Sequence, residues 1–440
     1  MRRFISSLNM LLALVLISAC AAPAAISPTS TPGSTPNKPL PATIAISTKP
    51  RITNPAAAPM DISQLVKGNN TFAFDLYQAL IDPATPNLFY SPYSISVALA
   101  MAQAGARGDT LAQMNQVLHY SLPDLSLHQA FNALQQDLAN RQKSTDQPGQ
   151  DDFQLNVANA TWGQAGYSFL PAYLDLLAEN YGAGLRLVDF KSSPEQARQM
   201  INDWVAQQTA QKIKDLIPQG SIDPLTRLVL SNAIYFKAGW MNMFDAKRTV
   251  PGNFNTLDGK QVNAPMMNQQ ASFNYYDGGA YQAVELPYAG NKLSMLVLMP
   301  GAGQFASFEK SLNLAQVDSI RKNLSEASVQ LTFPKFKVES SFSLSGTLAK
   351  MGMANAFDSS KADFSGMDGT HDLSITSVVH KAYVNVDENG TEAAAATAVV
   401  IGLTSIRVDV IDLKIDHPFI YLIQDNETGA ILFIGRVTSL

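Results

Sequence analysis

Residues 386–405 read VDENGTEAAAATAVVIGLTS, and this composition fits two local structures. The alanines favour a helix, and Thr391 before Glu392 could begin one, so a short helix between two strands is one interpretation. If the segment is instead a strand, positions 391, 393, 395, 397 and 399 share one face, and Thr, Ala, Ala, Thr and Val occupy them. The charged Glu392 then lies on the opposite face. Such a strand could enter a preformed sheet without burying a charge.

Several segments together resemble the serpins, the serine protease inhibitor family. Residues 386–405 resemble the hinge of the serpin reactive loop. Residues 87–108 resemble the family's second-helix block, and residues 228–240 resemble the central strand that follows the sixth helix. Near the C-terminus, residues 417–420 and 432–436 match the closing signature of the family. The similarity covers nearly all of the chain after residue 60.

This resemblance implies an α+β fold with three β-sheets, eight or nine helices and an exposed reactive loop. A target protease attacks the loop and becomes acylated, and the cleaved loop then inserts into the large sheet and drags the protease with it. The resemblance therefore implies a suicide inhibitor of serine endopeptidases, or of cysteine endopeptidases, and not an enzyme.

The resemblance also assigns three groups of residues around the large sheet. A buried polar network at the middle of the sheet could control strand separation, although a single histidine is more often simply satisfied in a core. An ion pair is expected at the head of the sheet, the alternative being an exposed pair of little energetic value. The hinge maps to Glu388, Gly390, Thr391, Glu392, Ala393, Ala394, Ala395, Ala396 and Thr397; the breach, at the head, to Trp240, Lys335 and Glu388; and the shutter, at the middle, to Ser91, Ser94, Asn232 and His380.

The bond that a protease would cleave lies in the second half of the loop. Counting 16 residues beyond Glu388, as the resemblance implies, gives the bond Thr404–Ser405, and counting one fewer gives cleavage after Leu403. Cleavage after Arg407 would suit a trypsin-like protease but would lengthen the inserted segment. The apolar sequence before Ser405 instead favours elastase-like or subtilisin-like proteases as targets.

The first 19 residues have the features of a secretion signal. Two arginines follow the initial methionine, and an uncharged, largely apolar stretch then runs to residue 19, which is too short for a comfortable membrane span. Residues 16–20, LISAC, resemble a bacterial lipobox, so Cys20 is expected to carry lipid. The alternative is an ordinary signal peptide cleaved near Ala22 or Ala25. We expect a secreted lipoprotein, anchored by its lipid to a membrane on the cell surface or the periplasmic face.

Residues 20–60 have the composition of a tether. Nine of the 24 prolines fall between residues 21 and 60, among Ser, Thr and Ala, and such sequence cannot bury a core. Residues 61–440 are expected to form one mixed domain. Within it, the apolar spacing predicts helices over 70–80, 95–118, 171–181 and 193–216, strands over 293–299 and 329–333, and a hairpin over 419–437.

The composition excludes several classes of protein. The 440 residues are 46% apolar and only 15% charged, with a formal net charge of −5, so no nucleic-acid-binding surface is expected. HExxH, GxSxG and Walker motifs are absent, and we expect no cofactor, no metal and a monomer. Two other functions compete, namely a non-inhibitory serpin acting as a binding module and a solute-binding lipoprotein of a transporter. Charge or bulk at the inward hinge positions would favour the first, and two similar lobes would favour the second.

Overall fold

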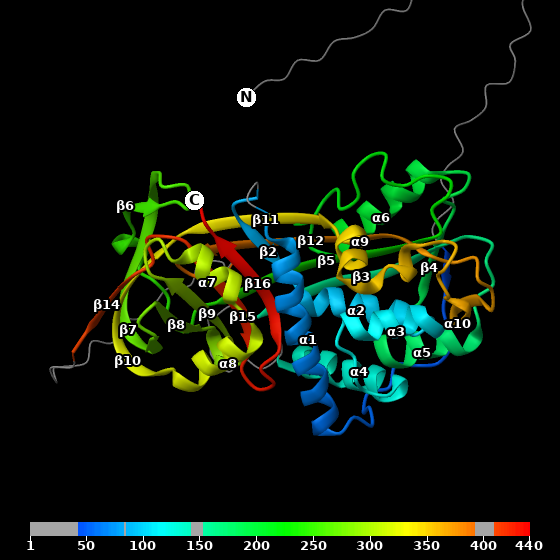
Figure 1. Ribbon diagram of the computed structural model, residues 1–440, viewed down its shortest axis with the longest axis horizontal. Helices are drawn as coiled ribbons and strands as arrows, with labels where there is room; N and C mark the ends of the chain where they lie inside the picture. The colour runs from blue at the N-terminus through cyan, green and yellow to red at the C-terminus, as the bar shows by residue number, and fades with distance from the viewer. Residues whose placement is uncertain (1–42, 83–84, 142–152, 392–408) are drawn as a thin grey trace, which may run out of the picture. The chain divides into compact units, whose positions relative to one another are not determined.

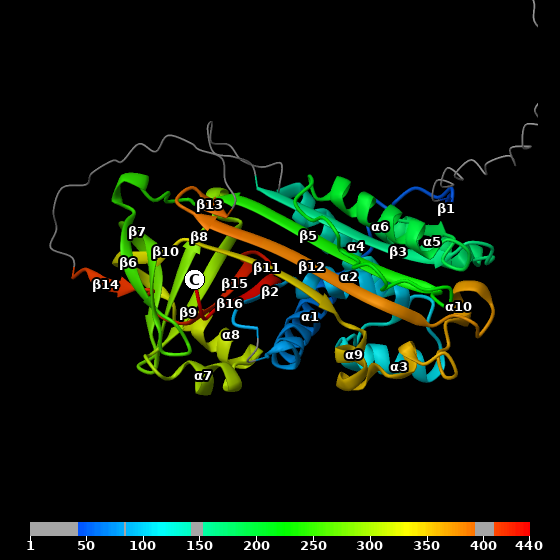
Figure 2. The same cartoon turned by 90° about the horizontal axis from the view of Figure 1, so that it is seen from above.

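The computed structural model describes residues 43–82, 85–141, 153–391 and 409–440. A seven-stranded sheet runs in the order β1 (Thr43–Ala45), β4 (Leu185–Val188), β3 (Gln154–Gln164), β5 (Leu228–Gly239), β13 (Gly390–Thr391), β12 (Ile375–Asp387) and β11 (Phe336–Ser343). Its long strands β3, β5 and β12 lie side by side (Figure 2). Nearly every residue of β5 is buried, as expected for a central strand covered on both faces.

A second sheet has nine strands. Eight follow the order β14 (Ile411–Lys414), β10 (Ser325–Pro334), β7 (Gln261–Asp277), β8 (Tyr281–Pro287), β9 (Leu293–Pro300), β15 (Phe419–Asp425), β16 (Ile431–Val437) and β2 (Leu88–Tyr90), and β6 (Val250–Asn255) pairs with β7. The 17-residue β7 pairs successively with β6, β10 and β8 and so joins two groups of strands. The three expected sheets are therefore hydrogen-bonded as two among the described residues. The α+β fold and the strand and hairpin predictions are confirmed.

Helices cover both faces of the seven-stranded sheet (Figure 1). The α-helices of the described residues are α1 (Pro59–Leu80), α2 (Pro92–Gln103), α3 (Gly108–Val117), α4 (Asp124–Arg141), α5 (Pro171–Tyr181), α6 (Pro194–Gln208), α7 (Phe305–Ser311), α8 (Leu314–Asn323), α9 (Ser345–Leu348) and α10 (Ser365–Asp368). α6 packs on one face through Ala197, Ile201 and Val205. α2 is buried along its whole length and packs on the other face. In the part of the chain that the structure describes, no helix combines the length and apolar character needed to cross a membrane.

Two helices differ in length from the prediction. α1 begins eleven residues before residue 70, with Pro59 at its first position and the Asp61 carboxylate accepting from Ala58 N at 3.2 Å. These are ordinary helix-start signals, and they extend the helix beyond its apolar stripe. α6 ends at residue 208 and not at 216, because Thr209 turns the chain and Ala210 has φ 49°.

The helix expected over 95–118 is broken into α2 and α3. A Cβ at Gly105 would lie 2.2 Å from the side chain of Met367, so the chain packs too closely there for an ordinary helical residue. Arg107 N also donates to Asp363 O at 2.9 Å instead of continuing the helical ladder. Contacts with a distant part of the chain therefore override a continuous apolar pattern.

The segment before α1 packs on the folded unit. β1 adds an edge strand to β4, and Ile52 N donates to Glu179 O at 2.8 Å. Lys49 pairs with both Asp175 and Glu179, each at 3.1 Å. The structure therefore places residues 43–60 with the folded unit, although their composition predicts a tether. Backbone pairing and ion pairs hold this segment, and neither requires apolar residues.

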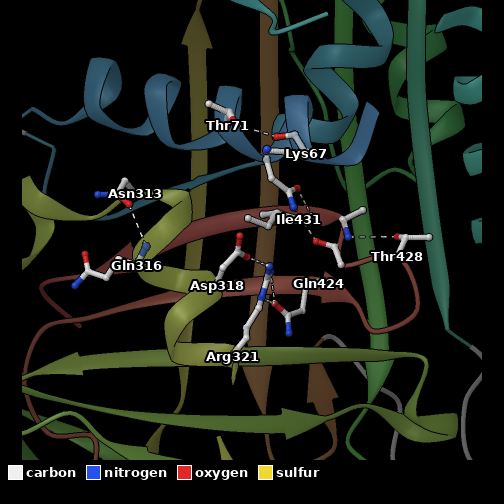
Figure 3. Close-up of polar contacts among 12 residues, drawn as sticks. Lys67, Thr71, Asn313, Gln316, Asp318, Arg321, Gln424, Thr428 and Ile431 are labelled. Carbon is white, nitrogen blue, oxygen red and sulfur yellow. Dashed lines mark hydrogen bonds and ion pairs between the residues drawn. The ribbon is translucent and has the colours of Figure 1, made fainter. Parts of the chain in front are cut away.

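Polar contacts fix the hairpin of β15 and β16 against α1 and α8 (Figure 3). Arg321 of α8 points at Gln424 and donates to it at 2.9 and 2.5 Å. Asn70 of α1 accepts from Ile431 N at 2.9 Å and donates to Gly429 O at 2.8 Å. These contacts hold β16 in place beneath α2, where it meets the candidate site.

Candidate functional site

The place that could receive an inserted loop is the junction of β5 and β12. The two strands pair directly, in parallel, over residues 228–235 and 375–383, and we call this region the β5–β12 seam. At the head of the seam, β13 lies between the strands and pairs antiparallel with both (Figure 2). The pairs are Gly390–Gly239 and Thr391–Ala238 with β5, and Gly390–Asp387 and Thr391–Val386 with β12.

Gly390 is required by a close approach of two backbones. Its φ is +154°, and a Cβ at this position would lie 2.1 Å from Ala238 O. Any other residue would force β5 and β13 apart. One residue earlier, Asn389 O accepts from Trp240 N at 2.9 Å, so the contact with the end of β5 is continuous.

Two aromatic rings hold the start of β13. Trp240 and Tyr288 stack with their ring centroids 4.7 Å apart, and Trp240 Nε1 donates to Asp387 O at 3.0 Å. The Tyr288 hydroxyl lies 2.7 Å from Thr391 Oγ1, and both residues are buried. The side chain of Thr391 therefore faces the core, which fixes the face that each later residue of the same strand would take.

Lys335 and Glu388 form the ion pair expected at the breach. Lys335 Nζ lies 2.7 Å from Glu388 Oε2, and Thr249 Oγ1 donates to Glu388 Oε1 at 2.8 Å. Burial alone would raise the pKa of Glu388, but the hydrogen bonds from Lys335 and Thr249 outweigh it and hold the pKa below its ordinary value. The Lys335 side chain keeps 35% of its exposure, so solvent screens the pair.

The four predicted shutter residues form one fully buried network. Ser91 caps α2: its Oγ accepts from Ser94 N at 3.1 Å and donates to Leu432 O at 2.6 Å. Asn232 Nδ2 donates to Ser94 Oγ at 2.6 Å, and Asn232 Oδ1 contacts His380 Nδ1. The network thus joins α2, β5, β12 and β16.

The protonation of His380 follows from its partners. Ser91 N–H donates to Nε2 at 3.2 Å, so Nε2 is the acceptor and Nδ1 carries the proton that Asn232 Oδ1 accepts. Burial lowers the pKa of His380 to about 3, so the ring is neutral at neutral pH. His380 and Asn232 also stand opposite each other in the β5–β12 register. Separating the strands at this point therefore breaks a buried hydrogen bond.

Three residues of the site escape the sequence analysis. Asn159 of β3 extends the shutter network, accepting from Ser94 Oγ at 3.0 Å and donating to Ser94 O at 3.1 Å. An amide within a strand of small and apolar residues is the one signal that could have marked it. Thr249 and Tyr288 lie just outside regular elements, where no pattern marks them.

The other predicted site residues lie outside the described residues, so their assignments stay predictions. They are Glu392, Ala393, Ala394, Ala395, Ala396 and Thr397 of the hinge, Leu403, Thr404, Ser405 and Arg407 at the candidate bonds, and Cys20.

Known proteins similar to this chain share one family. The serpin family, described as serine protease inhibitor, matches residues 67–440. An uncharacterised serpin-like protein of Thermococcus kodakarensis is 41% identical over 375 residues, which are 85% of each chain. Human leukocyte elastase inhibitor is 39% identical over 389 residues, covering 86% of this chain and 100% of that protein. The crystal structure of the thermophilic serpin tengpin in its native state matches with a TM-score of 0.80 and 28% identity, over 91% of this chain and 100% of that chain.

Proposed function

The chain belongs to the serpin family, and from this premise we propose that it is a suicide inhibitor of serine endopeptidases. A target protease cleaves the reactive loop and remains attached as an acyl-enzyme while the loop inserts between β5 and β12. Insertion releases the free energy stored in the native fold only once, so each inhibitor molecule is consumed. Cysteine endopeptidases, which also form acyl intermediates, are a second class of target.

The observation that carries this proposal is the position of β13. Its two residues already pair with both β5 and β12, and below β13 these two strands pair directly with each other across the seam. An extended loop that continues from Thr391 would enter the β5–β12 seam antiparallel to both neighbours. Each inserted residue would exchange a parallel pairing for two antiparallel ones, which gives insertion a net gain in hydrogen bonds.

The register of β13 predicts how much of the loop the sheet can accept. In antiparallel pairing, each step forward in the loop is matched by one step back along β5. Leu228 lies eleven residues before Gly239, and Ile401 lies eleven residues after Gly390, so Ile401 falls opposite Leu228 at the far end of β5. The inserted strand would then span about 40 Å at roughly 3.3 Å per residue.

The same register predicts which loop residues would be buried. Because Thr391 faces the core, residues 393, 395, 397, 399 and 401 would face it too, and these are Ala, Ala, Thr, Val and Ile. Glu392 would face outward. The loop therefore presents small or apolar side chains inward along its whole insertable length, which argues against the non-inhibitory binding module.

The length of the insertable segment bears on the reactive bond. Leu403 and Thr404 follow Ile401 by two and three residues, a short connection that would hold the acylated protease against the end of the sheet. Arg407 follows by six residues and would leave slack. We therefore assign the bond to Thr404–Ser405, with cleavage after Leu403 as the alternative. Elastase-like or subtilisin-like proteases suit both, and the similarity to leukocyte elastase inhibitors supports this class.

The test is to incubate the purified protein with elastase and with subtilisin. A covalent complex that survives denaturant should form at near 1:1 stoichiometry, and under denaturing conditions a peptide that begins at Ser405 should separate from it. Clean cleavage with release of active protease would contradict inhibition and favour a binding module. A stable trypsin adduct at Arg407 would instead move the reactive bond and leave the mechanism standing.

Two neighbouring substitutions separate insertion from recognition. Thr391→Arg places a charge where the strand must face the core, so cleavage should continue but the covalent complex should be lost. Glu392→Arg is the matched control, because its side chain would face solvent, and this variant should still inhibit. Equal behaviour of the two variants would contradict the proposed register.

The proposal extends to the N-terminus and the location of the protein. The inhibitor is a secreted monomer, and Cys20 carries a lipid that holds it at a membrane, on the cell surface or the periplasmic face. The residues between Cys20 and the folded unit act as a tether. The lipobox-like sequence before Cys20 supports this. In cells that make the full precursor, the protein should fractionate with membranes, and Cys20→Ala should release it. A Cys20→Ala protein that stays with membranes would contradict the lipid anchor.

A further inference from the structure

A cavity of about 290 Å³ lies beside β3, and Asn159, which extends the shutter network, is one of its lining residues. Residues of α2, α4, β3 and the end of α5 line it, and Figure 1 shows these three helices on the same side of the sheet. Much of its wall is apolar, formed by Val97, Met101, Leu138, Leu155 and Val157. Its volume is at the lower end of the range of roughly 300–1,000 Å³ for small-molecule sites.

A half-buried cation also lines this cavity. Arg51 donates from Nε to Asn132 Oδ1 at 2.8 Å and from one terminal nitrogen to Gln135 Oε1 at 2.6 Å. Both acceptors are neutral amides, and its other N–H groups have no partner among the described residues. Burial lowers the pKa of Arg51, but an arginine stays charged at neutral pH.

Two more deeply buried arginines each pair with a carboxylate. Arg436 pairs with Glu309 at 2.8 Å, and Arg141 pairs with Asp425. Arg51 has no carboxylate partner in the part of the chain that the structure describes. A cation that is partly removed from water without a counter-charge is costly, and an anion in the adjoining cavity would offset that cost.

A second polar group in the cavity wall lacks a partner. Tyr93 is only 3% exposed and lines the cavity, and its hydroxyl makes no hydrogen bond to any described residue. Arg51 lines the same cavity, so one ligand in it could reach both groups. Buried tyrosine hydroxyls usually find a partner, so this one is available to donate to a ligand.

The position of Arg51 is fixed before any ligand arrives. Its neighbour Ile52 is bonded to Glu179 O at 2.8 Å, and Lys49 pairs with Asp175 and Glu179 outside the cavity wall. A cation held in this way loses little conformational entropy on binding, which favours affinity.

We propose that this cavity binds a small amphipathic anion, with a carboxylate on Arg51 and Tyr93 and an apolar body along the α2, α4 and β3 wall. A medium-chain fatty acid of roughly ten to fifteen heavy atoms fits the volume. The site is independent of loop cleavage, so it stands whether or not the protein inhibits a protease.

The test uses decanoate and its neutral isostere decanamide, titrated calorimetrically into the full chain carrying Cys20→Ala, which removes the proposed lipid. Decanoate should bind 1:1, about tenfold or more tighter than decanamide, since a hydrogen bond to a charged group contributes that much. Arg51→Gln should weaken decanoate binding by about tenfold and abolish the preference. Tyr93→Phe should weaken it by a smaller factor. Lys67→Gln, the matched control, removes an exposed cation of α1 that lies outside the cavity wall, and this variant should bind as the parent does.

Circular dichroism would show whether Arg51→Gln folds. If it does not fold, the comparison of decanoate with decanamide on the parent protein still tests the proposal. Equal affinity for decanoate and decanamide, or no saturable binding of decanoate, would overturn the proposal. So would a folded Arg51→Gln protein that binds decanoate unchanged, or a Lys67→Gln protein that loses binding to the same extent.

Discussion

The head and the middle of the β5–β12 seam are held by different kinds of interaction. At the head, Lys335 and Glu388 form a charged pair that solvent reaches. At the middle, Asn232 and His380 share a neutral hydrogen bond with no exposure. A partly exposed ion pair is worth little and is screened by salt, whereas breaking a buried network leaves polar groups without partners. The difference indicates that the middle of the seam resists strand separation more strongly than the head does.

The largest expected effect is at the middle. His380→Ala removes the hydrogen-bond partner of the buried Asn232 Oδ1 and of the buried Ser91 N–H. It should destabilise the native state by about 3 kcal/mol. A lower urea midpoint, with faster polymerisation on mild heating, would show this. The matched control is Thr161→Val in the same sheet, because the buried Thr161 hydroxyl has no partner among the described residues. An equal loss in the control would mean that any change in this core has the same result.

Acid should weaken the middle before the head. Burial lowers the pKa of His380 to about 3 and that of His128 to about 4, whereas both titrate near 6.5 in the unfolded chain. Below pH 6.5 the unfolded state therefore binds protons that the native state does not, so the free energy of unfolding decreases as the pH is lowered. From pH 6.5 to 5.0, His380 alone should account for a loss of about 2 kcal/mol.

The measurement is the urea midpoint as a function of pH. His380→Gln should show a shallower dependence between pH 6.5 and 5.0, by about one proton. The low pKa of Glu388 keeps that carboxylate charged through this window, since its contribution is lost only as pH falls through the depressed value. A Glu388 variant that flattens the same window as much as His380→Gln would reverse the comparison.

At the head, a smaller effect is expected. Glu388→Gln keeps an acceptor for Thr249 but removes the charge that Lys335 faces, and should cost about 1 kcal/mol or less. A double-mutant cycle with Lys335→Gln would isolate the pair, and its coupling should be well below the loss in His380→Ala. A coupling above about 3 kcal/mol would place the stronger interaction at the head.

Salt should produce the smallest effect. Raising sodium chloride to 1 M should reduce the Lys335–Glu388 coupling by about 0.5 kcal/mol and leave the cost of His380→Ala unchanged. Repeating both measurements at low and high salt checks this. A salt-dependent cost of His380→Ala would show that the middle of the seam is not the neutral network described above.

Much of the site could be predicted because its residues lie in segments that resemble a known family. Ser91, Asn232 and Lys335 stand within or beside regular elements, and each contacts another residue of the group to which the resemblance assigns it. Thr249 could not be found in this way, because its contact with Glu388 depends on how a loop folds back over the end of the sheet. Sequence patterns report the periodicity of an element and not the path of the loops between elements.

The errors in the fold have the same cause. An unbroken apolar pattern predicts one helix over 95–118, but the close contact of Gly105 with Met367 splits it. The Pro-rich composition predicts a tether through residue 60, but an edge strand and the ion pairs of Lys49 hold residues 43–58 on the fold. In both cases contacts with residues distant in the sequence determine the local structure, and no local sequence pattern indicates those contacts.

The short strand β13 also sets the order of events in a zipper-like insertion. Its residues Gly390 and Thr391 are a preformed nucleus, so propagation begins without the cost of closing the first rung. Thr397 lies seven residues after Gly390, and Asn232 and His380 lie seven residues before the partners of Gly390 on β5 and β12. In the proposed insertion, Thr397 would thus be the residue that arrives between Asn232 and His380 as their bond breaks. Its hydroxyl would offer a replacement hydrogen-bond partner at the position where the buried network opposes strand separation.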